Sequence, residues 1–216
     1  MCMKQILVMM VVLVGCGEDT RKAAPKKAPS AEEIAISIVD SIVEKAVREQ
    51  LVKPEGELTN ADLEKVTDLS LDFTKITDEG IKELAKFQNL THLSLADTQI
   101  TDDGLKEVAK LQKLERLVLS KIQITDAGLK EVTKLKKLQV LYLVGTQITD
   151  AGLKEVATLQ KLMLLSLGDT QITDTGLKEV AKLQKLEELY VNDAKVTKVG
   201  VAELKKALPN CIIFCP

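Results

Sequence analysis

The chain has 216 residues, of which 45% are hydrophobic and 29% charged, a balance that indicates one folded domain with a short appendage. Its 30 basic and 32 acidic side chains are interspersed and leave a formal net charge of -2, which excludes the concentrated basic face that nucleic-acid binding needs. Aromatic residues make up only 2%, and the single histidine, His92, is a poor start for a metal site or a catalytic dyad. We therefore expect an aliphatic core and no cofactor or metal.

The first sixteen residues have the pattern of an export signal. Lys4 supplies a positive region, and the apolar run from Ile6 to Val14 is too short to span about 30 Å of hydrocarbon as a helix. The sequence Leu-Val-Gly-Cys that ends at Cys16 resembles a lipobox, in which signal peptidase cuts before a cysteine whose thiol is acylated. This resemblance predicts a signal peptide over 1–15 and lipidation of Cys16. The alternative is an ordinary signal peptide with an incidental cysteine.

Lipid on Cys16 would place the protein in a bacterial cell envelope. Each buried methylene of an acyl chain contributes about 0.8 kcal/mol, so two or three chains anchor a protein stably to a membrane facing the periplasm or the exterior. Residues 16–30 are rich in Pro, Ala and Lys without apolar periodicity, which predicts an extended, flexible linker. Which membrane holds the anchor stays open.

Residues 31–66 are expected to be helical. Ser-Ala-Glu-Glu from Ser30 is a capping-box pattern, and the apolar positions after it predict a helix over 31–52 that ends at Lys53–Gly56. Asn60 to Val66 indicates a second short helix. We interpret this region as a cap for the repeats that follow; a partner-binding or coiled helix is the alternative.

A repeat of 24 residues fills most of the remaining chain. Ile-Thr-Asp recurs in one phase, beginning at Ile76, Ile100, Ile124, Ile148 and Ile172. In each unit, leucines two apart, such as Leu93 and Leu95, face one side of a strand. Leu105 and Val108 then lie on one helical stripe, with Thr101–Asp102 before it in a position to cap the helix. Each unit is therefore predicted to be strand, turn, short helix, turn.

This frame resembles the leucine-rich repeat family, and its Thr-Asp-x-Gly-Leu continuation looks most like the cysteine-containing branch known from F-box leucine-rich proteins. The resemblance covers roughly 60–216 and implies an α/β curved solenoid, with parallel strands on the concave face and short helices on the convex face. Residues 67–208 would hold the repeats and 209–216 a C-terminal capping strand. We place the strands near 68–72, 92–96, 116–120, 140–144, 164–168, 188–192 and 211–215.

Three smaller features accompany the repeat. Threonine at the family's Asn or Cys position could form a hydroxyl ladder between coils, at Thr74, Thr98, Thr146 and Thr170. Aspartates after the strand, interpreted as turn formers rather than calcium ligands, recur at Asp97, Asp169 and Asp193. Cys211 and Cys215 lie about 13 Å apart in an extended strand, too far for a disulfide.

Variation between copies is concentrated on the solvent-facing strand positions, while the helical segments are nearly identical. Tyr142 and Tyr190 occupy the same position of the repeat on two strands that are two apart, so they lie about 10 Å from each other. Tyrosine is enriched at binding hot spots. The predicted binding residues of the concave face are Arg116, Val118, Val140, Tyr142, Val144, Leu164, Glu188 and Tyr190. Phe214 shares the position of the tyrosines in one register of the last strand and turns inward in the other.

No hydrolase, metalloprotease, redox or phosphate-binding motif is present, so we expect no enzyme. The predicted function is a monomeric, lipid-anchored envelope protein that binds a partner protein through its concave face. The alternative is a structural or spacer protein with no specific ligand. A remote alternative is a substrate-recognition module like the repeats of F-box adaptors, although residues 31–66 are too short for an F-box.

Overall fold

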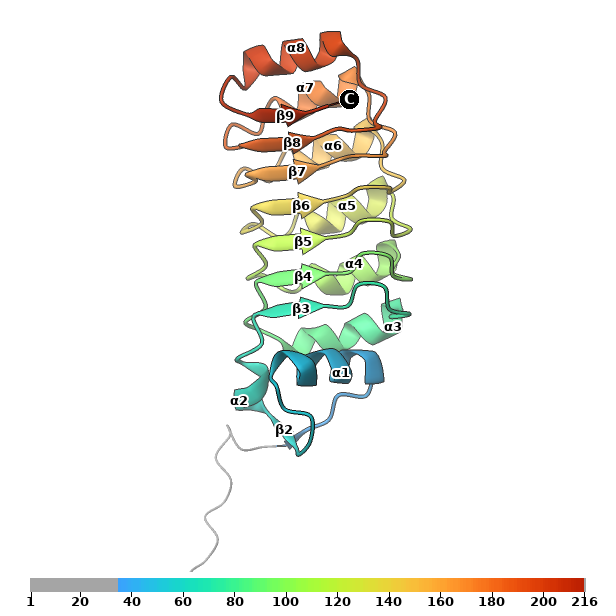
Figure 1. Cartoon of the computed structure of the whole chain (residues 1–216), viewed down its shortest axis with the longest axis vertical. Coiled ribbons are helices and arrows are strands. Elements are labelled where there is room, and N and C mark those ends of the chain that lie inside the picture. Colours follow the sequence, from blue (N-terminus) through green and yellow to red (C-terminus); the bar gives the residue numbers. More distant parts are fainter. Residues whose placement is uncertain (1–34, 216) are drawn as a thin grey trace, which may run out of the picture.

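The computed structural model describes residues 35–215, which form a stack of coils with strands along one side and helices along the other (Figure 1). Seven parallel strands make one sheet in chain order, namely β3 (Asp68–Ser70), β4 (His92–Ser94), β5 (Arg116–Val118), β6 (Val140–Tyr142), β7 (Leu164–Ser166), β8 (Glu188–Tyr190) and β9 (Ile212–Phe214). The predicted α/β solenoid and the positions of all seven strands are confirmed, although each strand is shorter than the predicted segment.

One helix follows each strand up to β8. They are α3 (Asp78–Ile81), continued by the 3₁₀ helix η2 (Lys82–Lys86), then α4 (Asp102–Val108), α5 (Asp126–Val132), α6 (Asp150–Val156), α7 (Asp174–Val180) and α8 (Lys198–Ala207). Neighbouring helices pack against one another and neighbouring strands pair, so each coil contacts mainly the coils beside it.

The core is the aliphatic column between sheet and helices. The central leucine of every strand from β3 to β8 points into it, and each is at most 4% exposed. Leu105 and Val108 of α4 face the same column, as the helical stripe predicts. Among the described residues, Phe87 is the only aromatic side chain that is fully buried. The aliphatic core expected from composition is therefore confirmed.

The threonine and the aspartate of each repeat have different roles, although the sequence pattern predicted helix capping for the pair. The Thr101 hydroxyl accepts a hydrogen bond from the Asp103 amide and caps α4, as predicted. The carboxylate of Asp102 instead reaches the next coil, where it accepts the Thr125 amide at 2.9 Å and the Thr125 hydroxyl at 2.6 Å. We call this pair of hydrogen bonds the clamp. It recurs between the threonine of the next coil, 23 residues later, and Asp78, Asp126, Asp150 and Asp174.

The glycine of each repeat makes room for this clamp. A Cβ atom on Gly128 would overlap Oδ1 of Asp102 in the preceding coil, and Gly104 stands in the same relation to Asp78. Neither glycine has a positive φ. The requirement is therefore space for the carboxylate rather than backbone freedom.

The threonines expected to form a ladder between coils act within their own coil. The hydroxyls of Thr98, Thr146 and Thr170 are buried, and each donates to the carbonyl three residues earlier, at 2.6 to 2.8 Å. Thr74 makes the same bond at 2.6 Å while partly exposed. Each hydroxyl thus closes its local turn and satisfies a strand-end carbonyl.

The turn after the strands of the solenoid has one residue in the left-handed region. Asp97, Asp169 and Asp193 occupy it with φ of 54°, 49° and 59°, so they stand where the chain turns. Phe73, Lys121 and Gly145 fill the same slot in other coils.

The N-terminal cap differs from the predicted helix over 31–52. Residues Ala35–Ile36 form the short strand β1, which pairs antiparallel with β2 (Leu58–Thr59), and α1 runs only from Ser41 to Gln50. Helix α1 starts where it does because the Asp40 carboxylate accepts the amides of Ile42 and Val43. The capping-box residues Ser30–Glu33 lie outside the described residues.

The second helix, α2 (Asn60–Leu63), is shorter than the predicted segment Asn60 to Val66. Its N-terminus is stabilised by a capping box between Thr59 and Asp62. The predicted signal peptide, Cys16 and the linker 16–30 also lie outside the described residues. Within residues 35–215, no helix combines the length and apolar character required to cross a bilayer.

Candidate binding face

The outward-facing residues of the sheet form two rows, which we call the strand face. One row is Asp68, His92, Arg116, Val140, Leu164, Glu188 and Ile212; the other is Ser70, Ser94, Val118, Tyr142, Ser166, Tyr190 and Phe214. Arg116 is exposed and the other predicted binding residues are partly exposed. Seven of the eight predicted residues lie on this face, and Val144 lies at its edge, two residues after the end of β6.

The N-terminal half of the strand face is polar. A hollow of about 290 Å³ is lined there by polar side chains that include Asp68, Asp72, His92 and Arg116. The His92 ring Nδ1 lies 2.9 Å from the Asp68 carboxylate and 3.1 Å from the Thr91 hydroxyl. His92 is thus part of a polar cluster on this face.

The C-terminal half is apolar and aromatic. The guanidinium carbon of Arg116 lies 5.1 Å from the centre of the Tyr142 ring, a cation–π distance that joins the two halves. Tyr190 and Phe214 stack with ring centroids 4.4 Å apart and an interplanar angle of 7°. Between the tyrosines, Ser166 is buried, so the rings stand on either side of a small residue.

The structure settles the register of the last strand. Phe214 pairs with Tyr190 and Ile213 with Leu189, so Phe214 belongs to the tyrosine row and Ile213 to the inward row. The aromatic surface is therefore larger than the two tyrosines predicted from the sequence.

Tyr190 is held in place by Glu188 as well as by the stack. Its hydroxyl donates a hydrogen bond of 2.8 Å to the Glu188 carboxylate. That hydrogen bond, together with partial burial, raises the pKa of Tyr190 above its usual value, because ionisation would remove the donor and place two negative charges together. Tyr190 is thus a neutral hydrogen-bonded ring near neutral pH.

The two cysteines of the last coil are free thiols, as their spacing predicts. Cys211 is buried and its pKa is raised by burial, whereas Cys215 is exposed. Within residues 35–215, no group of three or more His, Cys, Asp or Glu side chains could hold a metal ion.

The sequence and fold of this chain are similar to those of known repeat proteins. The family model for the leucine-rich repeat region matches residues 69–208. The crystal structure of internalin C2 from Listeria monocytogenes is similar, with 32% identity, a TM-score of 0.61, and coverage of 81% of this chain and 82% of that chain.

A second internalin, inlF from the same organism, has 23% identity and a TM-score of 0.61; the match covers 81% of this chain and 55% of inlF, and it supports the fold alone. A comparison with curated proteins finds no match. Because the repeat model spans more than half of the chain, the protein belongs to the leucine-rich repeat family.

Proposed function

We propose that this protein is a non-catalytic, lipid-anchored protein of the bacterial cell envelope that binds a partner protein through its strand face. The observation that carries the binding proposal is the partly exposed row of Val118, Tyr142, Tyr190 and Phe214 beside Arg116. Aromatic and arginine side chains in such a setting provide most of the energy of many protein interfaces. Membership of the repeat family supports an interaction role.

The rows also suggest how a partner is oriented. Charged groups lie at the polar hollow with Asp68 and His92, and apolar area lies toward β9. A partner with an apolar patch next to a charged patch would match both halves in only one direction.

The binding test uses the full chain, purified in mild detergent, as bait for an envelope extract of the parent cell. The Tyr142→Ala/Tyr190→Ala double variant and a helix-side control, Lys154→Ala/Lys178→Ala, are run beside it. A protein retained by the wild type and the control but lost with the tyrosine variant supports the proposal. Equal retention by all three folded baits would favour the structural or spacer alternative.

The anchor needs a separate test because it rests on sequence pattern alone. Cells expressing the chain are labelled with palmitate, and Cys16→Ser is compared with Cys215→Ser, which changes an exposed thiol at the other end. We expect Cys16→Ser to lose the label and Cys215→Ser to keep it. Label that persists in Cys16→Ser would remove the lipid anchor from the proposal without affecting the binding face.

A further inference from the structure

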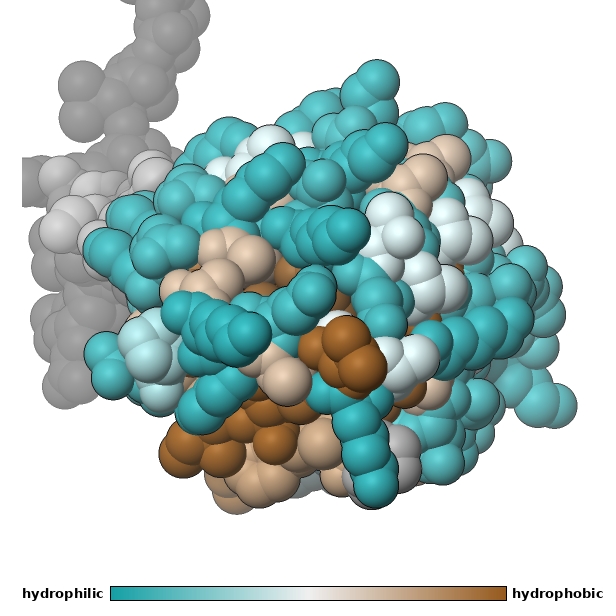
Figure 2. All heavy atoms as spheres, turned by 90° about the horizontal axis from the view of Figure 1, so that it is seen from above, coloured by the Kyte–Doolittle hydropathy of each residue, from teal (hydrophilic) through white to brown (hydrophobic). Residues whose placement is uncertain are grey.

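The C-terminal end of the solenoid has an apolar groove between β9 and α8. Two adjoining hollows of about 540 and 340 Å³ share Lys198, Val201 and Cys215 in their walls, and Ile212 and Ile213 line the larger one. Ile212 is 55% exposed. Seen from this end, hydrophobic residues gather over one side of the molecule and are bordered by hydrophilic ones (Figure 2).

Strand β9 also offers backbone hydrogen-bonding groups on its outer edge. The Ile212 amide donates to the Glu187 carbonyl at 2.7 Å, and the Phe214 carbonyl accepts from Val191 at 2.9 Å, so these two residues bond toward β8. The alternation of a parallel ladder turns the amide and carbonyl of Ile213 the other way. Within the described chain β9 is the last strand of the sheet, and such an edge is a template for an added strand.

The charge around the groove selects among possible occupants. Lys198 and Lys205 line the hollows, and no carboxylate does. A second copy pairing antiparallel along β9 would bring the N-terminal lysine of one α8 beside the C-terminal lysines of the other, which repel. The chain's own segment 17–34 carries four acidic and four basic residues and almost no large apolar side chains. An acidic partner with apolar side chains complements the groove better than either.

We propose that this groove binds an extended acidic segment of another protein, which adds a strand to the edge of β9. Its alternate apolar side chains would enter the groove beside Val201 and Ile213, and its carboxylates would meet Lys198 and Lys205. The site shares Ile212 with the strand face, but its other lining residues lie on α8, on the inward side of β9 and in the loops beside them. A partner on the tyrosine row is therefore not required for the groove to be occupied.

The test measures fluorescence anisotropy of a labelled seven-residue peptide in which Val alternates with Glu, titrated with the full chain in mild detergent. We expect saturable binding of this peptide and none of a matched peptide with Lys in place of Glu. Lys198→Glu, at the exposed first residue of α8, should weaken binding about tenfold. Lys154→Glu, the same charge change on exposed α6, should leave it unchanged.

Ile213→Pro removes the outward-facing amide while leaving the bonds of Ile212 and Phe214 to β8, and should also abolish binding. Circular dichroism checks that this variant is folded. If it is not, the proposal is judged by comparing peptide binding to Lys198→Glu with binding to Lys154→Glu. Binding of both peptides alike, of neither, or without effect of Lys198→Glu would overturn the proposal. Tighter binding of a peptide of residues 17–34, or a dimer that Ile213→Pro dissociates, would overturn it in favour of those occupants.

Discussion

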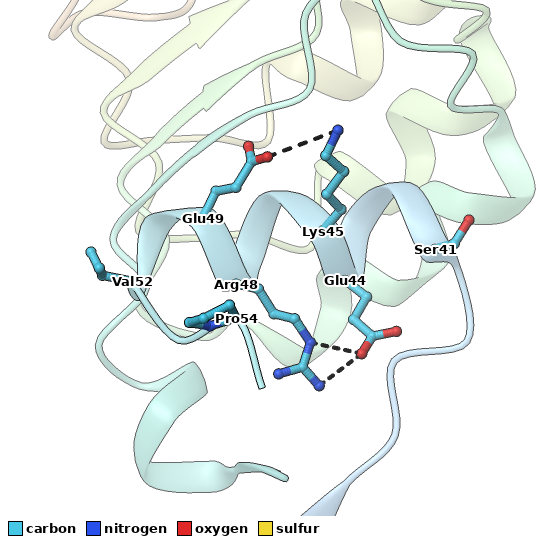
Figure 3. A pocket seen from close by; sticks show the side chains of 7 residues that line it. All are labelled: Ser41, Glu44, Lys45, Arg48, Glu49, Val52 and Pro54. Atoms are coloured by element: carbon cyan, nitrogen blue, oxygen red, sulfur yellow. Dashed lines mark hydrogen bonds and ion pairs between the residues drawn. The ribbon is translucent and has the colours of Figure 1, made fainter. Parts of the chain in front are cut away.

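At the N-terminal end of the solenoid α1 packs against β3 and α3, whereas at the C-terminal end β9 and α8 leave apolar side chains open to solvent. The outer side of α1 carries the ion pairs Arg48–Glu44 at 2.8 Å and Lys45–Glu49 at 3.9 Å, which line a hollow there (Figure 3). A repeat stack needs a polar surface at each end to stay soluble. Val39 and Val52 beside α1 are also exposed, so the two ends differ in the ion pairs on α1 and in the outer edge of β9 rather than in exposed apolar residues alone.

A charge placed at each end of the solenoid should affect stability very differently. Val47 of α1 is fully buried and Val199 of α8 is 67% exposed. We expect Val47→Asp to lower the free energy of unfolding by about 3 kcal/mol or more, because the carboxylate would be buried without a partner. Val199→Asp should change it by less than about 0.5 kcal/mol. Urea denaturation measures both, and equal losses would show that the two ends are equally part of the core.

The aspartate clamps between coils should contribute more to stability than exposed ion pairs on the helices. Asp126→Ala removes two hydrogen bonds to Thr149, of 2.8 and 2.6 Å, and should cost about 2 kcal/mol in unfolding free energy. Asp103→Ala, which removes an exposed ion pair with Lys106, is the matched control and should change the unfolding free energy much less. Denaturant titrations that rank Asp103→Ala above Asp126→Ala would contradict the assigned role of the clamp.

The repeat made the fold predictable, while contacts between coils could not be read from it. Leu93 and Leu105 recur at a fixed period, and that period alone defines strand, helix and inward direction. Asp102 recurs as regularly, but beside Thr101 it has the pattern of a helix cap; its bond to Thr125 depends on how coils stack. The glycine in every Thr-Asp-x-Gly unit was the available signal, since it leaves space for a carboxylate from the coil before.

Where the repeat stops, prediction was weaker. The capping-box pattern before α1 suggested an early helix start, but pairing of β1 with β2 holds residues 35–36 extended, and Asp40 starts the helix. On the candidate site, alternation alone placed seven of the eight predicted residues on the strand face, and Val144 at its edge. It could not fix Phe214, because a shift of one residue exchanges the faces of a strand.

Acid should affect the capped end through Asp62. A hydrogen bond from Lys53, together with those from Thr59, holds the pKa of the Asp62 carboxyl well below its ordinary value. The depressed folded-state pKa means that this contribution to stability is present above the unfolded pKa, near 3.8, and is lost as pH falls below it.

Lys53→Met should therefore lower stability at pH 7 and reduce the part of the loss on going to pH 3 that Asp62 causes. Lys65→Met, which removes a longer and more exposed contact of 3.4 Å to the same carboxylate, should have the smaller effect. Urea midpoints at the two pH values measure both. An unchanged pH dependence in Lys53→Met would show that Asp62 is not the group responsible.

The smallest effect is expected at the open end itself. Phe214 is 40% exposed and stacks on Tyr190, so Phe214→Ala should cost about 1 kcal/mol. Because β9 is the outermost strand, the loss should appear as faster amide hydrogen exchange in β8 and β9 with β3 unchanged. Phe214→Leu keeps apolar area without the ring and separates stacking from burial. A loss from Phe214→Ala as large as that from Val47→Asp would mean that β9 belongs to the closed core, and the contrast between the two ends would fail.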